Sequence, residues 1–123
     1  MSGLQFRTLD IAAKVRGGDI SVTEVTKAVF ADIAQRDERL NCVTRPLTDR
    51  ALAAAAAVDA AVAEGRDPGA LAGVPFGIKD LFDVAGQVTT AGSKVLANDP
   101  PATRDAALVT RLIDAGAIPV ALT

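Results

Sequence analysis

Residues 73–80 read Gly73-Val74-Pro75-Phe76-Gly77-Ile78-Lys79-Asp80, an apolar run that opens with glycine and closes with a lysine and an aspartate. A run this short and apolar predicts a buried strand over 74–79. Residues 103–115 then predict a helix that stops at Gly116, and 117–122 predict a second strand. A strand, a long crossover containing a helix and another strand form an open βαβ unit, so we expect the two strands to be parallel.

The second predicted strand contains Pro119, which has no backbone donor for a sheet ladder. We therefore expect this strand at a sheet edge or beside a bulge. Parallel sheets require several strands with cover on both faces, whereas the chain stops at Thr123, on its second strong strand. These features predict an α/β fold that is incomplete at Thr123. Residues 1–123 would be the N-terminal part of a single domain, with no internal boundary, in a longer parent protein.

Three helices are predicted before this unit. Thr8 is expected to cap the first, and Gly17-Gly18 to end it. The second opens with a capping box, Ser21-Val22-Thr23-Glu24, in which the serine hydroxyl accepts a backbone bond and the glutamate reaches back. An inward stripe follows at Val22, Val25, Val29 and Ile33. Pro46 is expected to begin a turn before the third helix, 49–63, whose alanine-rich middle allows close approach of another element.

Composition excludes several classes of site. The 123 residues contain no histidine, which rules out a Ser-His-Asp triad, a Cys-His pair and the common zinc sites. The net charge of −2 gives no electrostatic reason to expect binding to nucleic acid or to an anionic membrane. Cys42 is the only cysteine, which excludes an internal disulfide and fits a reducing compartment. No apolar segment approaches the ~20 residues that span a bilayer, so we expect a cytoplasmic protein.

Lys79 stands in the most unusual chemical setting. It does not belong to a phosphate-binding loop, because Ile78 rather than glycine precedes it and Asp80 rather than serine or threonine follows it. A lysine acts as a base only where low-dielectric surroundings disfavour its charged form. Flanking side chains that would form such an apolar wall are Phe76, Ile78, Leu81 and Phe82.

A plainer interpretation is that Lys79 pairs with Asp80 or Asp83 and holds a loop, and the spacing alone favours it. The two aspartates would also be the only nearby ligands for a hard cation. Two carboxylates three residues apart are more typical of solvated loop acids, so no metal and no cofactor is expected.

The segment 71–93 resembles the lysine region of the amidase signature family, serine amidohydrolases that use a Ser–cis-Ser–Lys triad. The matching pieces are Leu71-Ala72-Gly73-Val74-Pro75, Ile78-Lys79-Asp80 and Thr89-Thr90-Ala91-Gly92-Ser93. The helix opened at Ser21, the Leu40-Asn41 connection and the stretch from Asp105 to Gly116 fit the family in the same order. The resemblance covers almost the whole chain. It implies the N-terminal portion of the amidase signature fold, a mixed sheet covered by helices.

The resemblance favours the base over the loop-holding role for Lys79. In the family, the lysine takes a proton, through a serine in a cis peptide, from a second serine that attacks the substrate carbonyl. Lys79 falls on the triad lysine, whereas the two serines and the glycine- and serine-rich signature have no counterpart before Thr123. Ser2, Ser21 and Ser93 are not substitutes for them. The parent protein is therefore expected to be an amide hydrolase, and the 123 residues alone to be inactive.

Several alternatives stay open for the substrate and the partners. Gly92-Ser93-Lys94 and the stretch from Pro100 to Asp105 are similar to the branch that hydrolyses carboxybiuret-like small amides with a small accessory subunit. The glutaminase subunit of the tRNA-dependent amidotransferase is the second alternative, and a generic aliphatic or aryl amidase the third. The resemblance implies a small-molecule amide substrate and a homodimer or a small accessory subunit, without direct contact to nucleic acid or membrane.

A hypothesis of another class is a non-catalytic helical interaction module, or an inactive fragment. Its docking face would combine the alanine-rich helix with the stripe at Val22, Val25, Val29 and Ile33. The alternative is that these faces pack on each other or on the sheet, and this alternative is favoured.

Overall fold

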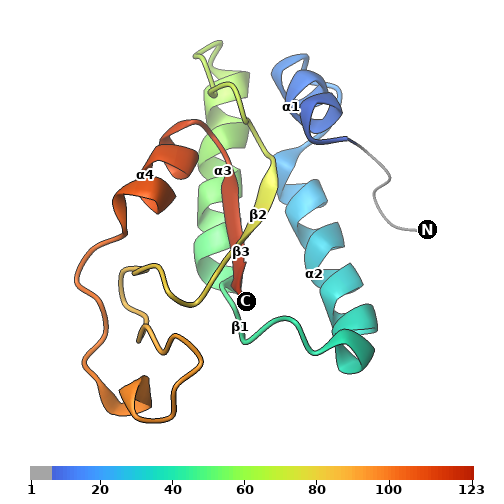
Figure 1. The fold of residues 1–123 in the computed structure, drawn as a ribbon. Coiled ribbons are helices and arrows are strands. Elements are labelled where there is room, and N and C mark those ends of the chain that lie inside the picture. The colour runs from blue at the N-terminus through green and yellow to red at the C-terminus, as the bar shows by residue number, and fades with distance from the viewer. Residues whose placement is uncertain (1–6) are drawn as a thin grey trace.

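The computed structural model describes residues 7–123, which form a mixed α/β fold as the sequence predicts (Figure 1). The elements in chain order are α1 (Thr8–Arg16), α2 (Val22–Leu40), β1 (Arg45–Pro46), α3 (Thr48–Ala63), β2 (Pro75–Ile78), the 3-10 helix η1 (Leu96–Asn98), α4 (Ala107–Asp114) and β3 (Ile118–Leu122). Ser2 lies outside the described residues.

The sheet is mixed and β3 lies at its centre, in the order β1-β3-β2. β2 pairs with β3 in parallel, which confirms the predicted βαβ unit, and β1 pairs with β3 in antiparallel orientation. The register of the parallel pair shifts between Phe76 and Gly77, where their partners are Pro119 and Ala121. The expectation of a bulge beside Pro119 is thus confirmed, while the alternative of an edge strand is wrong. Pro46 also departs from its predicted turn, because it pairs with Ala121 inside β1.

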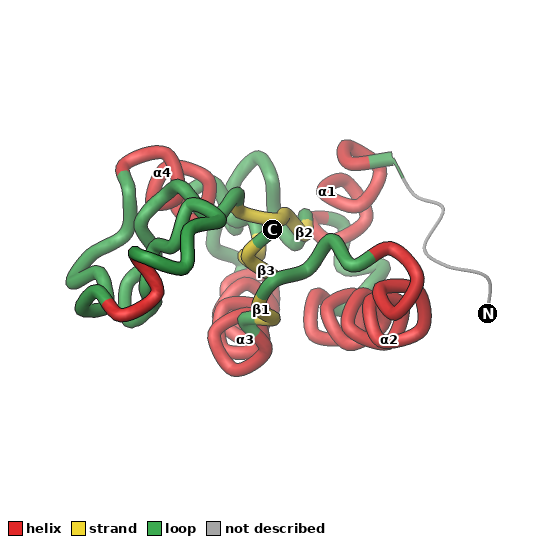
Figure 2. The backbone as a smooth tube through the Cα atoms, turned by 60° about the horizontal axis from the view of Figure 1, so that its bottom comes forward, coloured by secondary structure: helices red, strands yellow, loops and turns green. Residues whose placement is uncertain are grey.

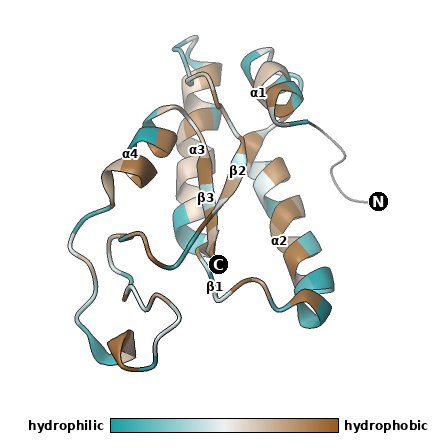
Figure 3. Cartoon of the chain, viewed as in Figure 1, coloured by the Kyte–Doolittle hydropathy of each residue, from teal (hydrophilic) through white to brown (hydrophobic). Residues whose placement is uncertain are grey.

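The helices bury an apolar core against these strands. Figure 2 shows α2 and α3 side by side, with α1 and α4 at opposite ends of the fold and the strands between them. Figure 3 shows α3 weakly hydrophobic along most of its length, in keeping with its alanine content, and Ala51 and Ala55 are fully buried where the helix approaches the sheet. β3 is buried at every position. The close approach predicted for the alanine-rich helix is confirmed.

The valine stripe of α2 faces this core. Val22 and Val25 are buried, and Val29 packs against the core cluster. The part of the stripe from Val22 to Val29 is therefore an internal packing face rather than a free docking surface, whereas Ile33 is half-buried.

Helix ends follow the predicted signals only in part. Gly17-Gly18 ends α1, with Gly18 at a φ of 75° and the Asp19 amide bonded to the Lys14 carbonyl at 2.9 Å. Thr8, predicted as the N-cap of α1, is instead its first helical residue, and Arg7 holds the cap position.

The N-terminus of α2 is capped from two sides. The Ser21 hydroxyl accepts from the Glu24 amide at 3.4 Å, as the capping box predicts. No bond from the Glu24 carboxylate back to Ser21 occurs within the described residues. Instead, Asp59 of α3 accepts from the Ser21 hydroxyl, the Val22 amide, and the Thr23 amide and hydroxyl at 2.7–3.0 Å. Burial alone would raise the pKa of Asp59, but the hydrogen bonds from Thr23, Val22 and Ser21 outweigh it and lower that pKa.

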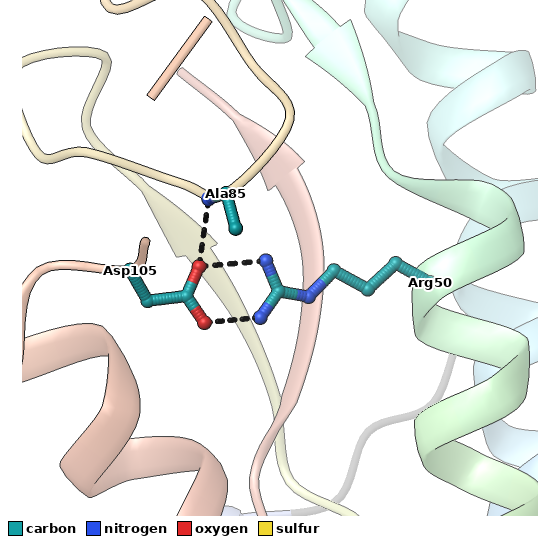
Figure 4. A network of polar contacts seen from close by, with 3 residues as sticks. All are labelled: Arg50, Ala85 and Asp105. Atoms are coloured by element: carbon teal, nitrogen blue, oxygen red, sulfur yellow. Dashed lines mark hydrogen bonds and ion pairs between the residues drawn. The ribbon is translucent and has the colours of Figure 1, made fainter. Parts of the chain in front are cut away.

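Asp105 holds together the two ends of the long loop between β2 and α4 and forms an ion pair, as Figure 4 shows. Asp105 forms a bidentate pair with Arg50 of α3 and also accepts from the Ala85 amide at 2.8 Å. The Arg50 guanidinium holds the pKa of Asp105 below its usual range, against the effect of burial. These contacts explain why α4 begins at Ala107 rather than at the predicted residue 103. Residues 102–106 form hydrogen bonds with residues 83–87, at the other end of the loop, instead of forming a helical turn.

We expect Asp59→Asn to lower the free energy of unfolding by about 1–2 kcal/mol at pH 7, since the charged cap of α2 is lost. Because folding lowers the pKa of Asp59, its contribution is fully present above the ordinary value of 3.8 and is lost as the pH falls through the lower folded value. The difference between variant and wild type should therefore shrink as the pH falls below 3.8. Urea unfolding of the protein over a pH range that extends to either side of this value measures it.

The matched control is Asp99→Asn, which removes a carboxylate that has no hydrogen bond within the described residues. It should leave the urea midpoint unchanged at both ends of the pH range. A loss in Asp99→Asn equal to that in Asp59→Asn would assign the effect to net charge and not to the cap.

Candidate functional site

Lys79 follows β2 directly and lies at the carboxyl ends of the parallel pair β2–β3. Its Nζ donates to the carbonyl oxygen of Thr123, the residue after β3, at 3.1 Å. The same carbonyl accepts from the Asp80 amide at 2.8 Å. Open α/β sheets bind their ligands outside the carboxyl ends of parallel strands, so the amine lies where a sheet of this kind binds its ligands.

The two aspartates that follow Lys79 are bonded to threonines. Asp80 is buried, and its carboxylate accepts from the Thr90 amide at 3.2 Å and from the Thr90 hydroxyl. Asp83 accepts from the Thr89 hydroxyl at 2.6 Å. Within residues 7–123, Lys79 forms no ion pair. The interpretation of Lys79 as the partner of Asp80 or Asp83 is therefore wrong for this part of the chain.

Hydrogen bonds hold the segment 89–93 against the residues that follow β2. The Ala91 amide donates to the Asp80 carbonyl at 2.7 Å, and the Ser93 amide to the Thr90 carbonyl at 2.8 Å. Ala91 has a φ of 48° and Gly92 a φ of 73°, so the backbone turns sharply just after Thr90. The sequence pieces around Lys79 and around Thr90 are thus neighbours in space.

The predicted apolar wall around Lys79 is only partly present. Phe76, Ile78 and Phe82 border a shallow depression of about 70 Å³ next to Lys79, together with three side chains of α4, namely Leu108, Val109 and Leu112. Leu81, expected in the wall, is 55% exposed. The Lys79 side chain is also exposed among residues 7–123, so these residues do not by themselves shelter the amine from water.

Two features of this site have no counterpart in the sequence-based predictions. The first is Thr90, which satisfies a buried carboxylate ten positions earlier. The second is Thr123, whose carbonyl receives the lysine amine. A pair of threonines following a pair of aspartates is a visible pattern, but no local rule connects residues across a turn of this length.

The other residues singled out lie elsewhere. Ser21 caps α2, and Ser93 accepts from the Val95 amide at 3.2 Å, so neither contacts Lys79. Cys42 is exposed, and its thiol donates a hydrogen bond to the Asp37 carboxylate. Within the described residues no three acidic, histidine or cysteine side chains gather as metal ligands would. None of the described helices is both long and apolar enough to cross a bilayer.

Comparison with known protein families decides the affiliation. The sequence model of the family named Amidase matches residues 24–123, which include Lys79 and the whole segment around it. The chain belongs to the amidase family. The predicted resemblance is thereby confirmed, together with the fold class that it implied.

The relatives within the amidase family include two kinds of protein. The chain is 41% identical, over all 123 residues, to a glutamyl-tRNA(Gln) amidotransferase subunit of Lachnospira eligens, and covers 25% of that protein. It is 39% identical over 112 residues to AtzE, a 1-carboxybiuret hydrolase subunit of Pseudomonas sp. strain ADP, where 91% of this chain covers 24% of the relative.

A solved amidase-family structure has nearly the same fold. It is a protein complex reported to reveal the evolutionary origins of an s-triazine catabolic enzyme, and it aligns with a TM-score of 0.92 at 38% identity. The alignment covers 94% of this chain and 25% of the solved one. The chain thus spans about a quarter of the length of the proteins it matches.

Proposed function

We propose that this chain is the N-terminal quarter of an amide hydrolase, here termed the parent protein, in which Lys79 is the proton acceptor of a Ser–cis-Ser–Lys triad. The observation that carries the proposal is the placement, at the carboxyl ends of β2 and β3, of an amine that has no acidic partner among residues 7–123. The family match over residues 24–123 supports it independently.

The proposed reaction is acyl transfer. A serine supplied by the rest of the parent protein attacks the amide carbonyl, and its proton passes through the cis-peptide serine to the neutral amine of Lys79. Collapse of the tetrahedral intermediate releases the amine product, which takes that proton back from Lys79 through the cis-peptide serine. Water then hydrolyses the acyl-enzyme, with Lys79 again accepting the proton. Backbone N–H groups outside this chain would hold the developing oxyanion. The rest of the parent protein would also cover the exposed side of Lys79 and exclude water from it.

For the substrate we propose a small amide of the carboxybiuret type. The likeness to the 1-carboxybiuret hydrolase relative over 91% of the chain supports this choice, as does the likeness to the solved complex reported to reveal the origins of an s-triazine catabolic enzyme. A glutaminase that feeds a tRNA-dependent amidotransferase is the second candidate, favoured by the likeness to the amidotransferase relative over all 123 residues. A small accessory subunit or a second copy of the chain would be the partner, and a cytoplasmic location fits the single, unpaired cysteine.

The test is ammonia release by the parent protein from 1-carboxybiuret, L-glutamine, acetamide and benzamide, each assayed alone and with charged tRNA. Hydrolysis of 1-carboxybiuret without tRNA supports the first candidate, whereas hydrolysis of acetamide or benzamide but not of 1-carboxybiuret favours a generic amidase. Glutamine hydrolysis that requires charged tRNA and a partner subunit shifts the choice to the second. A parent protein that releases no ammonia and reacts with no serine-directed probe would contradict the proposal and favour an interaction module.

We expect the 123-residue chain by itself to hydrolyse no amide, because a base without its nucleophile and oxyanion donors cannot run acyl transfer. Hydroxamate formation from acetamide and hydroxylamine is the sensitive assay. Product formed by the purified chain and abolished by Lys79→Ala would contradict this expectation.

A further inference from the structure

Asp80 is an unusual residue for a position directly after an exposed lysine, since only 6% of its surface is exposed. A buried carboxylate is tolerated when its oxygens are satisfied by hydrogen bonds. Among residues 7–123, both partners of the Asp80 carboxylate come from a single residue, because the Thr90 amide binds one oxygen and the Thr90 hydroxyl the other. A threonine ten positions away along the chain is thereby held against the end of β2.

The backbone of Asp80 joins the same residues to the lysine amine. The Asp80 amide donates to the Thr123 carbonyl at 2.8 Å, and that carbonyl is also the acceptor of Lys79 Nζ at 3.1 Å. The Asp80 carbonyl accepts from the Ala91 amide at 2.7 Å. Asp80 is therefore anchored on one side to the loop that carries Thr90 and on the other to the group that holds the amine.

We propose that Asp80 and Thr90 are positioning residues that fix the amine of Lys79 for proton transfer. This inference rests on the proposed function, because it gives the amine a reaction to perform. Asp80 acts through the backbone, which carries both its own amide and the neighbouring lysine side chain. The Lys79 carbonyl accepts from the Leu81 and Phe82 amides and the Asp80 amide donates to Thr123, so the bond to Thr90 adds a side-chain anchor to a peptide held by its backbone. Loss of that anchor lets Asp80 shift and moves the amine from its place.

The neighbouring bond between Asp83 and Thr89 is a matched control within the same loop. It also joins an aspartate carboxylate to a threonine hydroxyl, at 2.6 Å, but Asp83 is exposed and neither residue bonds to Thr123. Removal of this bond changes the loop without touching the peptide that carries Lys79.

The experiment measures the reaction of the parent protein with a fluorophosphonate probe. In that reaction the serine oxygen bonds to phosphorus, fluoride leaves and the serine proton passes to the lysine amine. The variants are Asp80→Ala, Thr90→Val, the double variant, Asp80→Asn, Asp83→Ala, Thr89→Val and Lys79→Met. For each one, kinact and KI are separated and the thermal midpoint is recorded.

Asp80→Ala and Thr90→Val should each lower kinact by about 10- to 100-fold while KI changes by less than about threefold, the size expected for a misplaced reacting group. The double variant should be no worse than Asp80→Ala, since both changes remove one shared interaction. Asp80→Asn should restore most of kinact, because its side-chain amide can accept from the Thr90 backbone and donate to the Thr90 hydroxyl. Asp83→Ala and Thr89→Val should stay within about twofold of wild type.

The inference is overturned if Lys79→Met abolishes labelling while Asp80→Ala and Thr90→Val leave kinact unchanged. It is equally overturned if Asp83→Ala slows labelling as much as Asp80→Ala. The same holds if the fold-loss of kinact in the double variant equals the product of the losses in Asp80→Ala and Thr90→Val. Labelling that survives Lys79→Met would overturn the proposed function instead. If Asp80→Ala does not fold, Thr90→Val carries the test, because it removes only the hydroxyl bond.

Discussion

Replacement of Lys79 by methionine is expected to lower the rate of amide hydrolysis by the parent protein by about a thousandfold or more. A positioned general base contributes roughly 10²–10⁴-fold, and the nucleophilic serine depends on that base for its activation. Methionine keeps the unbranched shape of the lysine stem but has no group that takes up a proton. Since the side chain is exposed among residues 7–123, its loss should leave the fold of this region intact.

Lys79→Arg separates the base role from the loop-holding role. A guanidinium keeps the positive charge and can still donate to the Thr123 carbonyl, so it would preserve a purely structural contact. It stays protonated at all working pH values and cannot accept the serine proton. We therefore expect Lys79→Arg to be as inactive as Lys79→Met.

Initial rates of ammonia release, taken with the thermal midpoint of each variant, measure these effects. The base assignment would be refuted by an arginine variant that keeps a tenth or more of wild-type turnover. Inactivity of both variants with unchanged midpoints would leave proton transfer as the role of Lys79.

β2, β3 and the position of the lysine after β2 could be predicted because their causes are local. A short apolar run between a glycine and an aspartate has few ways to fold, and the run at 74–79 becomes β2 with both ends within one residue of the prediction. The ends of α1 and α3 also have a local cause, because the glycines that follow them favour a backbone conformation that stops a helix. The bulge at Pro119 follows from a missing donor, which is also a local property.

The rest depends on partners that are distant in the sequence. α4 begins four residues late because Asp105 is bonded to Arg50, and α2 is capped by Asp59 of another helix. The two-residue β1 carries no pattern of its own and exists because β3 offers it a free edge. The bond between Asp80 and Thr90 belongs to the same class, since nothing near either residue specifies the other.

Gly116→Ala is expected to destabilise the fold by about 3 kcal/mol or more, the largest stability effect predicted here. Gly116 has a φ of 92°, and a Cβ at this position would lie 2.2 Å from the Pro68 carbonyl oxygen. Residues 68–69 and 115–116 thus cross in close contact. The contact is equally close from the other segment, because a Cβ on Gly69 would lie 2.3 Å from the Ala115 carbonyl oxygen. Backbone atoms cannot move aside as a flexible side chain does, so the two segments would have to separate.

Separation would also break the bonds that hold this crossing and the start of β2. The Leu71 amide donates to the Ala115 carbonyl at 2.8 Å, and the Gly73 amide to the Gly116 carbonyl at 2.9 Å. Since β2 begins at Pro75, a shift here would move the strand that ends at Lys79, and activity should fall together with stability. The thermal midpoint and the rate of ammonia release of the parent protein report the two effects.

Gly65→Ala is the control that isolates the steric contact from the backbone conformation. Gly65 also has a positive φ, of 69°, but a Cβ there would meet nothing within 4 Å. Its replacement should cost about 1 kcal/mol, the ordinary penalty for alanine in a left-handed conformation. At about 2–4 °C per kcal/mol for a domain of ordinary size, the two midpoints should differ by several degrees. Equal shifts in both variants would mean that conformation alone accounts for the loss, and that the close crossing of residues 68–69 with 115–116 contributes nothing.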